Sequence, residues 1–481
     1  MTSNICQDQI NTPSRSNPSP FAINNVRLFI WFSVFFHARF YYPVFTILFL
    51  DFGLTLEQFS ILNAVWAATI VVFEVPSGAL ADTFGRRNLL VCSGALMILE
   101  IALLCIVPHG KSDLLFAVFL VNRVLSGAAE AAASGADEAL AYDSLAQAGM
   151  ADTWRYVLER RIRAQSIAFI LAMSIGAAVY DPDFINILCE WLEWGALFSQ
   201  QTTIRFPLYL TFIMALLAFW TSLRMREINP PSEIMSAAEC ESDKHCVTSM
   251  RHAFYLTLNA GVWILKTPAA LIIIAAGLAF DHIIRMVMTL SSQYYRLILL
   301  PEATFGLIGA GLALLGLIVP RYAAKMVERY SPQFNLTMIS AMTLIGLGMM
   351  ALSLPVIGLI PIIILTSVMY MAGLFISHYL NRITDSHQRA TVLSFKGLSF
   401  NLAYGAFGLL YSFLLALLRS DYMLRVTPTI PGKSIEVNIF SMSLKWFPGY
   451  FLLLLSIGYI CFRHYRKHVE PSAFHSLDPE T

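Results

Sequence analysis

The chain of 481 residues is 57% hydrophobic and only 13% charged, whereas soluble globular domains have roughly 45–50% apolar and about 25% charged residues. Its formal net charge of +1 gives no excess of basic residues for nucleic acid. This composition excludes an ordinary soluble domain and indicates a membrane protein with many spans.

The N-terminal stretch is polar and rich in Pro, Ser and Asn, and it lacks the basic start, apolar core and cleavage site of a signal peptide. We expect residues 1–24 to form a disordered cytoplasmic tail. Twelve apolar segments follow, each close to the ~20 residues that a membrane-spanning helix needs. Their expected ranges are 25–50, 56–81, 88–107, 113–146, 162–180, 205–224, 266–298, 303–325, 335–354, 356–380, 391–418 and 444–463.

The loops on the two sides of the membrane differ in charge. By the positive-inside rule the loops rich in Arg and Lys face the cytoplasm, and an even number of spans then places both termini there. We therefore expect a multi-pass protein of the cell membrane, meaning the cytoplasmic or inner membrane. The residues on this side are Arg86, Arg87, Arg155, Arg160, Arg161, Arg163, Arg224, Arg226, Arg321, Lys325, Arg329, Arg382, Arg389, Arg463, Arg466 and Lys467.

A polar segment divides the twelve spans into two halves of six. We expect an N-terminal bundle over 25–224, a cytoplasmic linker over 225–265, a C-terminal bundle over 266–468 and a tail over 469–481. Residues 251–265 of the linker are amphipathic, which is typical of a helix lying along the membrane surface.

No cofactor or metal site is expected. Cys240, His245 and Cys246 lie in the linker, but their spacing fits no standard zinc pattern. The sequence contains no G-x-x-x-x-G-K-[ST] nucleotide loop, and no nucleophile–base spacing stands out. We therefore expect neither an enzyme nor an ATP-driven pump.

Residues 75–90 read VPSGALADTFGRRNLL. This stretch closely resembles the cytoplasmic loop signature of the major facilitator superfamily. A weaker match, Arg123-x-x-x-Gly127, is similar to the second motif of that family. The resemblance covers the whole chain and implies an all-α membrane protein with twelve transmembrane helices in two six-helix bundles. The signature positions are Gly78, Asp82, Gly85, Arg86 and Arg87.

The physical chemistry of this loop predicts a latch between helices. Gly78 permits close helix approach and Gly85 a tight turn. Asp82, at a helix end, can interact with the positive N-terminus of another helix. The family resemblance implies that this helix is the eleventh span, which starts near Ala390 and Thr391.

Arg86 and Arg87 can meet carboxylates at the cytoplasmic end of the fourth span. The available carboxylates are those of Asp137, Glu138 and Asp143. Such a latch would hold the two halves together on the cytoplasmic side and favour the outward-open state. The alternative is that the two arginines only anchor the topology.

Arg123, Glu130 and Asp137 are spaced seven apart, so they form one polar stripe along an α-helix. A charge near the bilayer centre costs roughly 2.5–3.5 kcal/mol, and such residues normally face a bundle interior or a water-filled cavity. In this superfamily spans one, four, seven and ten line the cavity. Glu100, on the third span, is an exception; it either pairs internally or indicates different packing.

Arg39 and Arg123 lie at the same depth and would repel each other without a negative group between them. A substrate carboxylate or phosphate could bind both as forked guanidinium–oxyanion pairs. Alternatively, each arginine pairs with a protein carboxylate or a backbone carbonyl. Asp281 and Arg285, one helical turn apart, either neutralise each other or contact the substrate separately.

Glu74 and Glu130 also lie level with each other. Carboxylates that are desolvated or close together favour the protonated form, so this pair is a candidate proton-coupling site. Alternatively, Glu74 braces a helix bend, since it precedes Val75-Pro76.

These features favour a secondary active transporter that moves a small polar or anionic organic solute by alternating access, coupled to protons. We expect its partners to be that solute, protons and the lipid bilayer, with the protein itself a monomer. One alternative is a proton-coupled exporter of drugs or siderophore-like metabolites, although the fifth span lacks the glycine-proline run of many drug antiporters. Another is a non-transporting receptor or assembly factor with the same fold.

Overall fold

The computed structural model describes residues 19–110, 113–195, 197–228, 267–355, 357–384, 389–425 and 432–466, together with residues 255, 261, 262 and 264. Within these ranges the regular structure is entirely helical. Twelve helical stretches are long and apolar enough to cross a membrane. The predicted all-α fold with twelve spans is therefore confirmed.

The first half contains ten α-helices among the described residues. They are α1 (Asn24–His37), α2 (Phe45–Phe52), α3 (Leu56–Phe84), α4 (Arg86–Ile106), α5 (Asp113–Ala133), α6 (Ala136–Gln147), α7 (Trp154–Tyr180), α8 (Pro182–Trp191), α9 (Gln200–Thr203) and α10 (Phe206–Arg224). Those described in the second half are α12 (Pro268–Thr289), α13 (Ser291–Leu297), α14 (Phe305–Arg329), α15 (Pro332–Ala351), α16 (Leu359–Ile383), α17 (Arg389–Arg425), α18 (Gly432–Leu444) and α19 (Trp446–Arg466).

Three of the spans expected to line the cavity are interrupted helices. The first span breaks between α1 and α2, where Pro43 lies in a 3₁₀ turn and offers no backbone N–H. The fourth breaks at Gly135, whose φ of 76° is the left-handed conformation that glycine adopts without strain. The seventh breaks at Leu290, between α12 and α13. Interrupted helices expose backbone groups that can only be tolerated inside the protein or beside a polar cavity.

Two segments predicted as loops contain helices instead. The chain from 419 to 445 includes the end of α17 and the whole of α18, and Arg419 and Glu436 of these two helices pair with each other, as described below. Residues 182–191 form α8, which begins with Pro182 and is capped by the side chain of Asp181. The predicted surface helix at 251–265 lies outside the described residues apart from four positions, and so do Cys240, His245 and Cys246.

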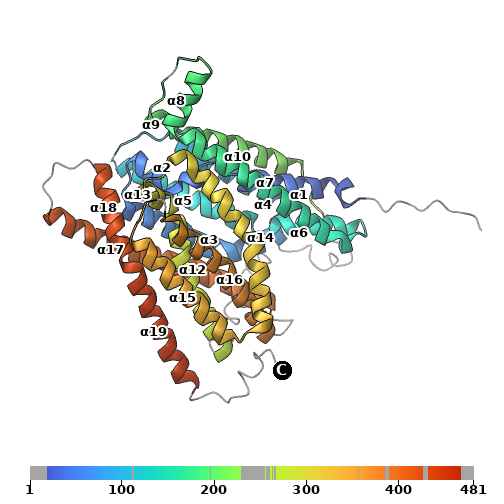
Figure 1. The fold of residues 1–481 in the computed structure, drawn as a ribbon. Helices are drawn as coiled ribbons and strands as arrows, with labels where there is room; N and C mark the ends of the chain where they lie inside the picture. The colour runs from blue at the N-terminus through green and yellow to red at the C-terminus, as the bar shows by residue number, and fades with distance from the viewer. Residues whose placement is uncertain are drawn as a thin grey trace, which may run out of the picture.

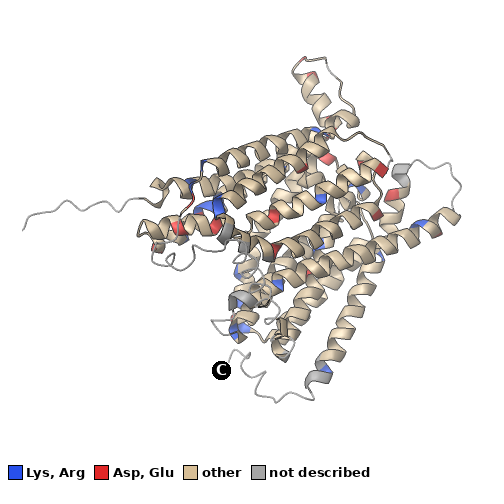
Figure 2. Cartoon of the chain, turned by 180° about the vertical axis from the view of Figure 1, so that it is seen from behind, with Lys and Arg blue, Asp and Glu red and all other residues tan. Residues whose placement is uncertain are grey.

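The two halves form separate bundles that join at one end and diverge from there (Figure 1). Asp51 lies near the end of α2 at the joined end, whereas Arg86 begins α4 at the other end. We refer to these as the Asp51 end and the Arg86 end. Many of the Lys and Arg residues lie at the diverging ends of the bundles (Figure 2).

Two pairs of helices carry most of the packing between the halves: α3 lies along α17, and α7 along α14. Gly306 shows how closely they approach, because a Cβ at this position of α14 would lie 2.0 Å from the carbonyl oxygen of Met173 on α7. On α17, a Cβ at Gly408 would lie 3.2 Å from the carbonyl oxygen of Ser60. Both contacts are nearer the Asp51 end of these helices than the Arg86 end.

Candidate functional site

Arg123 on α5 is buried, with 4% of its surface exposed. Its guanidinium donates from Nε and Nη2 to Oδ1 of the neighbouring Asn122, at 3.0 and 2.8 Å. It also lies 5.3 Å from the ring centre of Phe45 and 5.2 Å from that of Phe49, both on α2. Among the described residues no carboxylate forms an ion pair with Arg123. Its charge is therefore offset only by an amide oxygen and two aromatic faces.

Arg39 has different surroundings, although both arginines were expected to share a ligand. Its guanidinium forms an ion pair with Glu100 of α4, and both side chains are buried. It also donates to the hydroxyl of Tyr41 at 3.3 Å. Glu100, which did not fit the expected pattern of deep charges, thus has an internal partner. The two arginines differ in that Arg39 has a protein carboxylate and Arg123 does not.

Asp281 and Arg285 of α12 form an ion pair with an N–O distance of 2.6 Å. Arg285 also donates to Oδ1 of Asn401 on α17 at 2.9 Å and lies over the ring of Tyr404 at 5.3 Å. The pair remains partly exposed, at 15% for Asp281 and 25% for Arg285.

A contact between the halves links the surroundings of Arg123 and Arg285. Thr46 lies on α2 between the two phenylalanines that face Arg123, and it donates to the carbonyl oxygen of Thr289 at 2.6 Å. The hydroxyl of Thr289 lies 2.9 Å from that of Tyr404, the ring beneath Arg285. The two cationic groups thus belong to opposite halves and lie on either side of this contact.

The two candidate proton carriers, Glu74 and Glu130, lie on different helices of the first half. Glu74 lies within α3, which continues helically past Pro76. One of its carboxylate oxygens is buried and has no hydrogen-bond partner in the described part of the chain. Glu130 on α5 is partly exposed, and it forms no ion pair with any residue that the structure describes.

At the Arg86 end, most of the charged groups predicted for the latch are joined within the first half. Arg86 forms an ion pair with Asp143 of α6. Arg161 of α7 pairs with Glu138 at 2.7 Å and with Asp137 at 3.9 Å.

The remaining residues of the predicted latch make no described contact with the second half. Arg87 donates to the carbonyl oxygens of Met225 and Leu223 at 2.8 and 3.1 Å. Among the described residues, a Cβ at Gly78 would meet nothing within 4 Å. The side chains of Asp82, Ala390 and Thr391 lie outside the described residues.

Glu227, just after α10, is a contact that sequence reasoning missed. Its carboxylate accepts hydrogen bonds from the backbone N–H groups of Arg86 and Arg87 at 3.2 and 2.8 Å. These are free N–H groups at the start of α4, where a carboxylate also offsets the positive end of the helix dipole. The sequence did hold a signal for this contact. Glu227 is an acidic residue on the side of the loops rich in Arg and Lys, the same side as the start of a helix that begins with two arginines.

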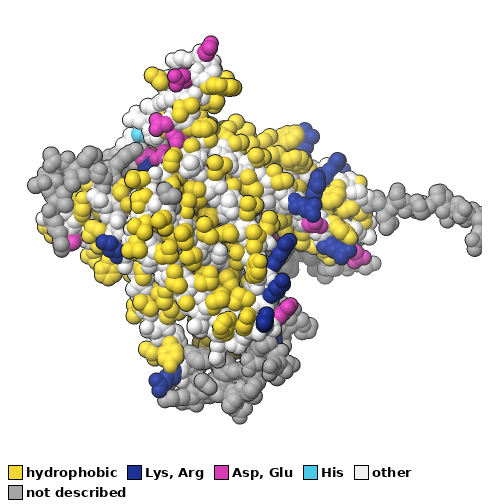
Figure 3. Space-filling view, viewed as in Figure 1, with side chains coloured by type: hydrophobic (Ala, Val, Ile, Leu, Met, Phe, Trp, Pro, Cys, Tyr) yellow, Lys and Arg dark blue, Asp and Glu magenta, His cyan; other side chains and the backbone are white. Residues whose placement is uncertain are grey.

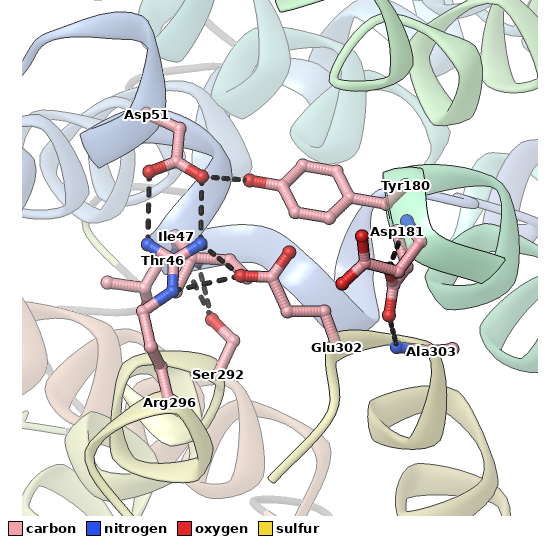
Figure 4. Close-up of polar contacts among 10 residues, drawn as sticks. Thr46, Ile47, Asp51, Tyr180, Asp181, Ser292, Arg296, Glu302 and Ala303 are labelled. Atoms are coloured by element: carbon pink, nitrogen blue, oxygen red, sulfur yellow. Dashed lines mark hydrogen bonds and ion pairs between the residues drawn. The ribbon is translucent and has the colours of Figure 1, made fainter. Parts of the chain in front are cut away.

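Two clusters join the halves at the Asp51 end. In the first, which we name the Asp51 clamp, Arg296 of α13 donates from Nη1 and Nη2 to the two oxygens of Asp51, at 3.0 and 2.8 Å (Figure 4). Arg296 also donates to Glu302, and the hydroxyl of Tyr180 donates to Asp51 at 2.6 Å (Figure 4). Tyr180 and Asp51 belong to the first half, Arg296 and Glu302 to the second.

The second cluster, the Glu57 clamp, repeats this composition. Arg419 of α17 donates to the two oxygens of Glu57 at 2.6 and 2.8 Å and to Glu436 of α18 at 2.6 Å. Each clamp therefore combines an arginine and a carboxylate of the second half with a carboxylate of the first. Neither clamp was singled out from the sequence, although the signal was available, because all of these charged residues lie at or near the ends of predicted spans on the same side.

A sequence profile described as Major Facilitator Superfamily matches residues 28–409. The chain belongs to the major facilitator superfamily. This membership identifies a multi-pass membrane transporter rather than an enzyme, one that binds small molecules within the membrane. No curated protein sequence matches the chain.

Solved structures of other superfamily members share the fold at low sequence identity. The nucleoside transporter NupG is 12% identical, with a TM-score of 0.66 over 92% of this chain and 99% of that one. A bacterial homologue of the human lysosomal transporter Spinster, in an inward-facing and unoccupied conformation, is 13% identical, with a TM-score of 0.63 over 95% and 100%. The xylose transporter XylE from E. coli, in an inward open conformation, is 12% identical, with a TM-score of 0.54 over 91% and 96%.

Proposed function

We propose that this superfamily member is a secondary active transporter of the cell membrane that moves a small anionic organic solute by alternating access, driven by protons. The observation that carries the substrate class is Arg123, which is buried without a carboxylate partner while Arg39, on the same half, has one in Glu100.

The arrangement of the halves supports alternating access. Their described hydrogen bonds and ion pairs with one another extend from the Thr46–Thr289 contact at the candidate site to the clamps at the Asp51 end. Those of Arg86, Arg87 and Arg161 stay on the side of the first half. The positive-inside rule supports a cytoplasmic position for the Arg86 end. We therefore assign this conformation as inward-open, a state that is also named for the similar Spinster homologue and XylE structures.

The surroundings of Arg123 favour an anionic solute. A buried guanidinium is stable when oxyanions accept its hydrogen bonds, and carboxylate and phosphate match its planar fork. Asn122 supplies only one neutral acceptor, and the rings of Phe45 and Phe49 leave the remaining donors for a ligand. Arg285, on the other half, faces the same contact around Thr46 and Thr289 and would bind a second polar group of the solute.

Proton coupling is proposed for Glu74 and Glu130. A buried carboxylate oxygen without a hydrogen-bond partner favours the protonated, neutral form in an apolar environment. Glu74 carries such an oxygen, and Glu130 lies two helical turns along α5 from Arg123. Protonation and release at these positions would accompany movement of the solute.

Uptake into vesicles that contain the purified protein tests the substrate class. A panel of small carboxylates, phosphate esters and uncharged analogues would be compared, with Arg123→Ala beside the wild type. Hydrogen bonds to a charged group contribute about 1.5–3 kcal/mol, so Arg123→Ala should reduce transport of the anion roughly tenfold or more. The matched control is Arg224→Ala, because Arg224 is exposed and lies over Trp220 at the Arg86 end. Normal anion transport by Arg123→Ala would overturn the assignment.

Proton coupling is tested with the same vesicles, with and without a pH gradient. Glu130→Gln and Glu74→Gln should each lose acceleration by the gradient while retaining exchange of solute between the two sides. A wild-type rate that does not respond to the gradient would exclude proton coupling but would leave the anion site standing.

A further inference from the structure

The segment from Pro182 to Ser199, which we name the α8 hairpin, projects from the Asp51 end beyond the transmembrane helices (Figure 1). It contains α8 and the chain that returns toward α9. We infer that the α8 hairpin is a membrane-surface anchor whose apolar face inserts into the interfacial layer of the lipid leaflet at the Asp51 end.

The hairpin is held in shape by its own hydrogen bonds. Asp181 caps α8 by accepting from the backbone N–H groups of Asp183 and Phe184, at 2.9 and 3.3 Å. The side chain of Asn186 donates to the carbonyl oxygen of Phe198 at 3.0 Å and accepts from its N–H at 2.7 Å. Because both arms are tied together, the exposed side chains are presented on a structured element.

One face of α8 is apolar and exposed. Phe184, Ile187, Leu188 and Trp191 follow the i, i+3, i+4, i+7 spacing that places side chains on one side of a helix. All four are classed among the exposed large apolar side chains, Trp191 with 79% of its surface accessible. The return arm also exposes Trp194 and Leu197, at 73% and 89%, although Leu197 borders a hollow that Asp183 and Glu190 line as well. A soluble surface rarely exposes so many large apolar side chains together.

The acidic residues lie on a different face. Asp183, Asn186 and Glu190 are spaced three and four apart, so they form their own stripe on α8. Cys189 of α8 is buried. An apolar stripe beside a polar one is the pattern of a helix that lies in the membrane interface, where tryptophan is also enriched.

The lipid bilayer is the occupant that the position of this face favours. The hairpin joins the end of α7 to the start of α10, and both helices carry exposed apolar side chains that face lipid, among them Ile175 and Ile213. Hydrophobic side chains cover the flank of the spans and recur on the hairpin above it (Figure 3). The apolar face of the hairpin is thus continuous with the lipid-contacting surface. Its acidic stripe makes a zwitterionic leaflet a better match than an anionic one.

The root of the hairpin also touches the contact between the halves. Asp181, whose Oδ1 caps α8, accepts from the backbone N–H of Ala303 of the second half through Oδ2 at 2.9 Å (Figure 4). Tyr180, the preceding residue, belongs to the Asp51 clamp. Anchoring of the hairpin therefore restrains the first half beside the cluster that closes the Asp51 end.

Tryptophan fluorescence of the full chain in zwitterionic nanodiscs tests this anchor. The signal of the hairpin is the difference between the wild type and the double variant Trp191→Phe/Trp194→Phe, which keeps the face apolar. We expect this component to be quenched by lipids brominated near the headgroup, less by lipids brominated near the chain ends, and to be protected from aqueous iodide. Trp220→Phe provides the control, because Trp220 is an exposed residue of α10, outside the spans expected to line the cavity, and its component should be quenched by lipid in any case.

Two outcomes would overturn the inference. Quenching of the hairpin component by iodide and not by brominated lipid would place the hairpin in water. Protection from both quenchers would indicate a protein surface, such as a second copy of the chain, in contact with it. Neither outcome bears on the anion site at Arg123, which is tested by transport.

Discussion

Arg296 of the second half donates to both carboxylate oxygens of Asp51 of the first half, and it does so beside a second carboxylate, Glu302. The Glu57 clamp has the same composition around Arg419. In each cluster one arginine pairs with two carboxylates, so the two halves cannot separate without leaving the first-half carboxylate without its arginine. A charge left without a partner in a partly buried site is costly. The two clamps therefore stabilise closure at the Asp51 end.

Asp51→Asn should weaken this closure. The amide keeps the size of the side chain but loses the charge that Arg296 binds, and hydrogen bonds to charged groups contribute about 1.5–3 kcal/mol. We expect the population open at the Asp51 end to rise roughly tenfold or more. Spin labels at the exposed Leu197 and Leu299 of the two halves would report a longer distance by pulsed electron resonance.

The matched control for this prediction is Asp113→Asn. Asp113 begins α5, is exposed, and forms no ion pair in the described part of the chain. Its substitution should leave the label distance unchanged. If Asp113→Asn and Asp51→Asn have equal effects, the Asp51 clamp contributes nothing beyond a change of net charge.

In the Glu57 clamp, removal of the arginine should be more damaging than removal of one acid. Arg419→Gln leaves Glu57 and Glu436 facing each other, and like charges at short distance repel. Glu57→Gln leaves Arg419 still paired with Glu436. We expect Arg419→Gln to open the Asp51 end more than Glu57→Gln, as measured by the same label distances.

A second substitution separates repulsion from simple loss of contacts. Glu436→Gln added to Arg419→Gln removes one of the two repelling carboxylates, so the closed population should partly recover. A double variant that is more open than Arg419→Gln alone would show that repulsion is not the cause.

The number of spans could be predicted from the sequence because each span carries its own apolar run. The charged stretches around α8 and α18 were predicted as loops because their charges suggested contact with water. Helices form there because Asp181 caps one of them and Glu436 of the other pairs with Arg419, 17 residues earlier in the chain. Such pairing depends on the fold rather than on local pattern.

In the candidate site, too, some features follow from the local sequence and others depend on the fold. The depth of Arg39 and Arg123 is a prediction from their distance to the ends of their spans. Which of them has a protein carboxylate could not, because Glu100 lies on a third helix and reaches Arg39 only through the packing of α4. The prediction of one polar stripe along a single helix was wrong for Asp137. Gly135 interrupts the fourth span, so Glu130 lies on α5 and Asp137 on α6. Depth follows from one helix, whereas partners follow from how several helices pack.

Gly306 should be essential for this conformation, because α14 approaches α7 through it. A Cβ there would lie 2.0 Å from the Met173 carbonyl oxygen and 2.5 Å from its carbon, and backbone atoms cannot move aside cheaply. Gly306→Val should therefore separate the helices, disfavour closure at the Asp51 end and reduce transport severely. Gly311→Val on the same helix is the control, since a Cβ there meets nothing within 4 Å. Equal transport by the two variants would contradict a requirement for close approach.

The two motif glycines should differ in what they contribute to stability. Gly85 has a φ of 90°, which side chains rarely adopt, and a Cβ would lie 2.7 Å from an oxygen of Glu227, the carboxylate that caps α4. Strained backbone of this kind costs about 1–3 kcal/mol, so Gly85→Ala should lower the melting temperature of the purified protein. Gly78→Ala should not, because the added carbon meets no atom of another described residue within 4 Å. Glu227→Ala should cost about 1 kcal/mol through loss of the cap. If Gly85→Ala melts like the wild type, neither the strain nor the contact with Glu227 constrains the start of α4.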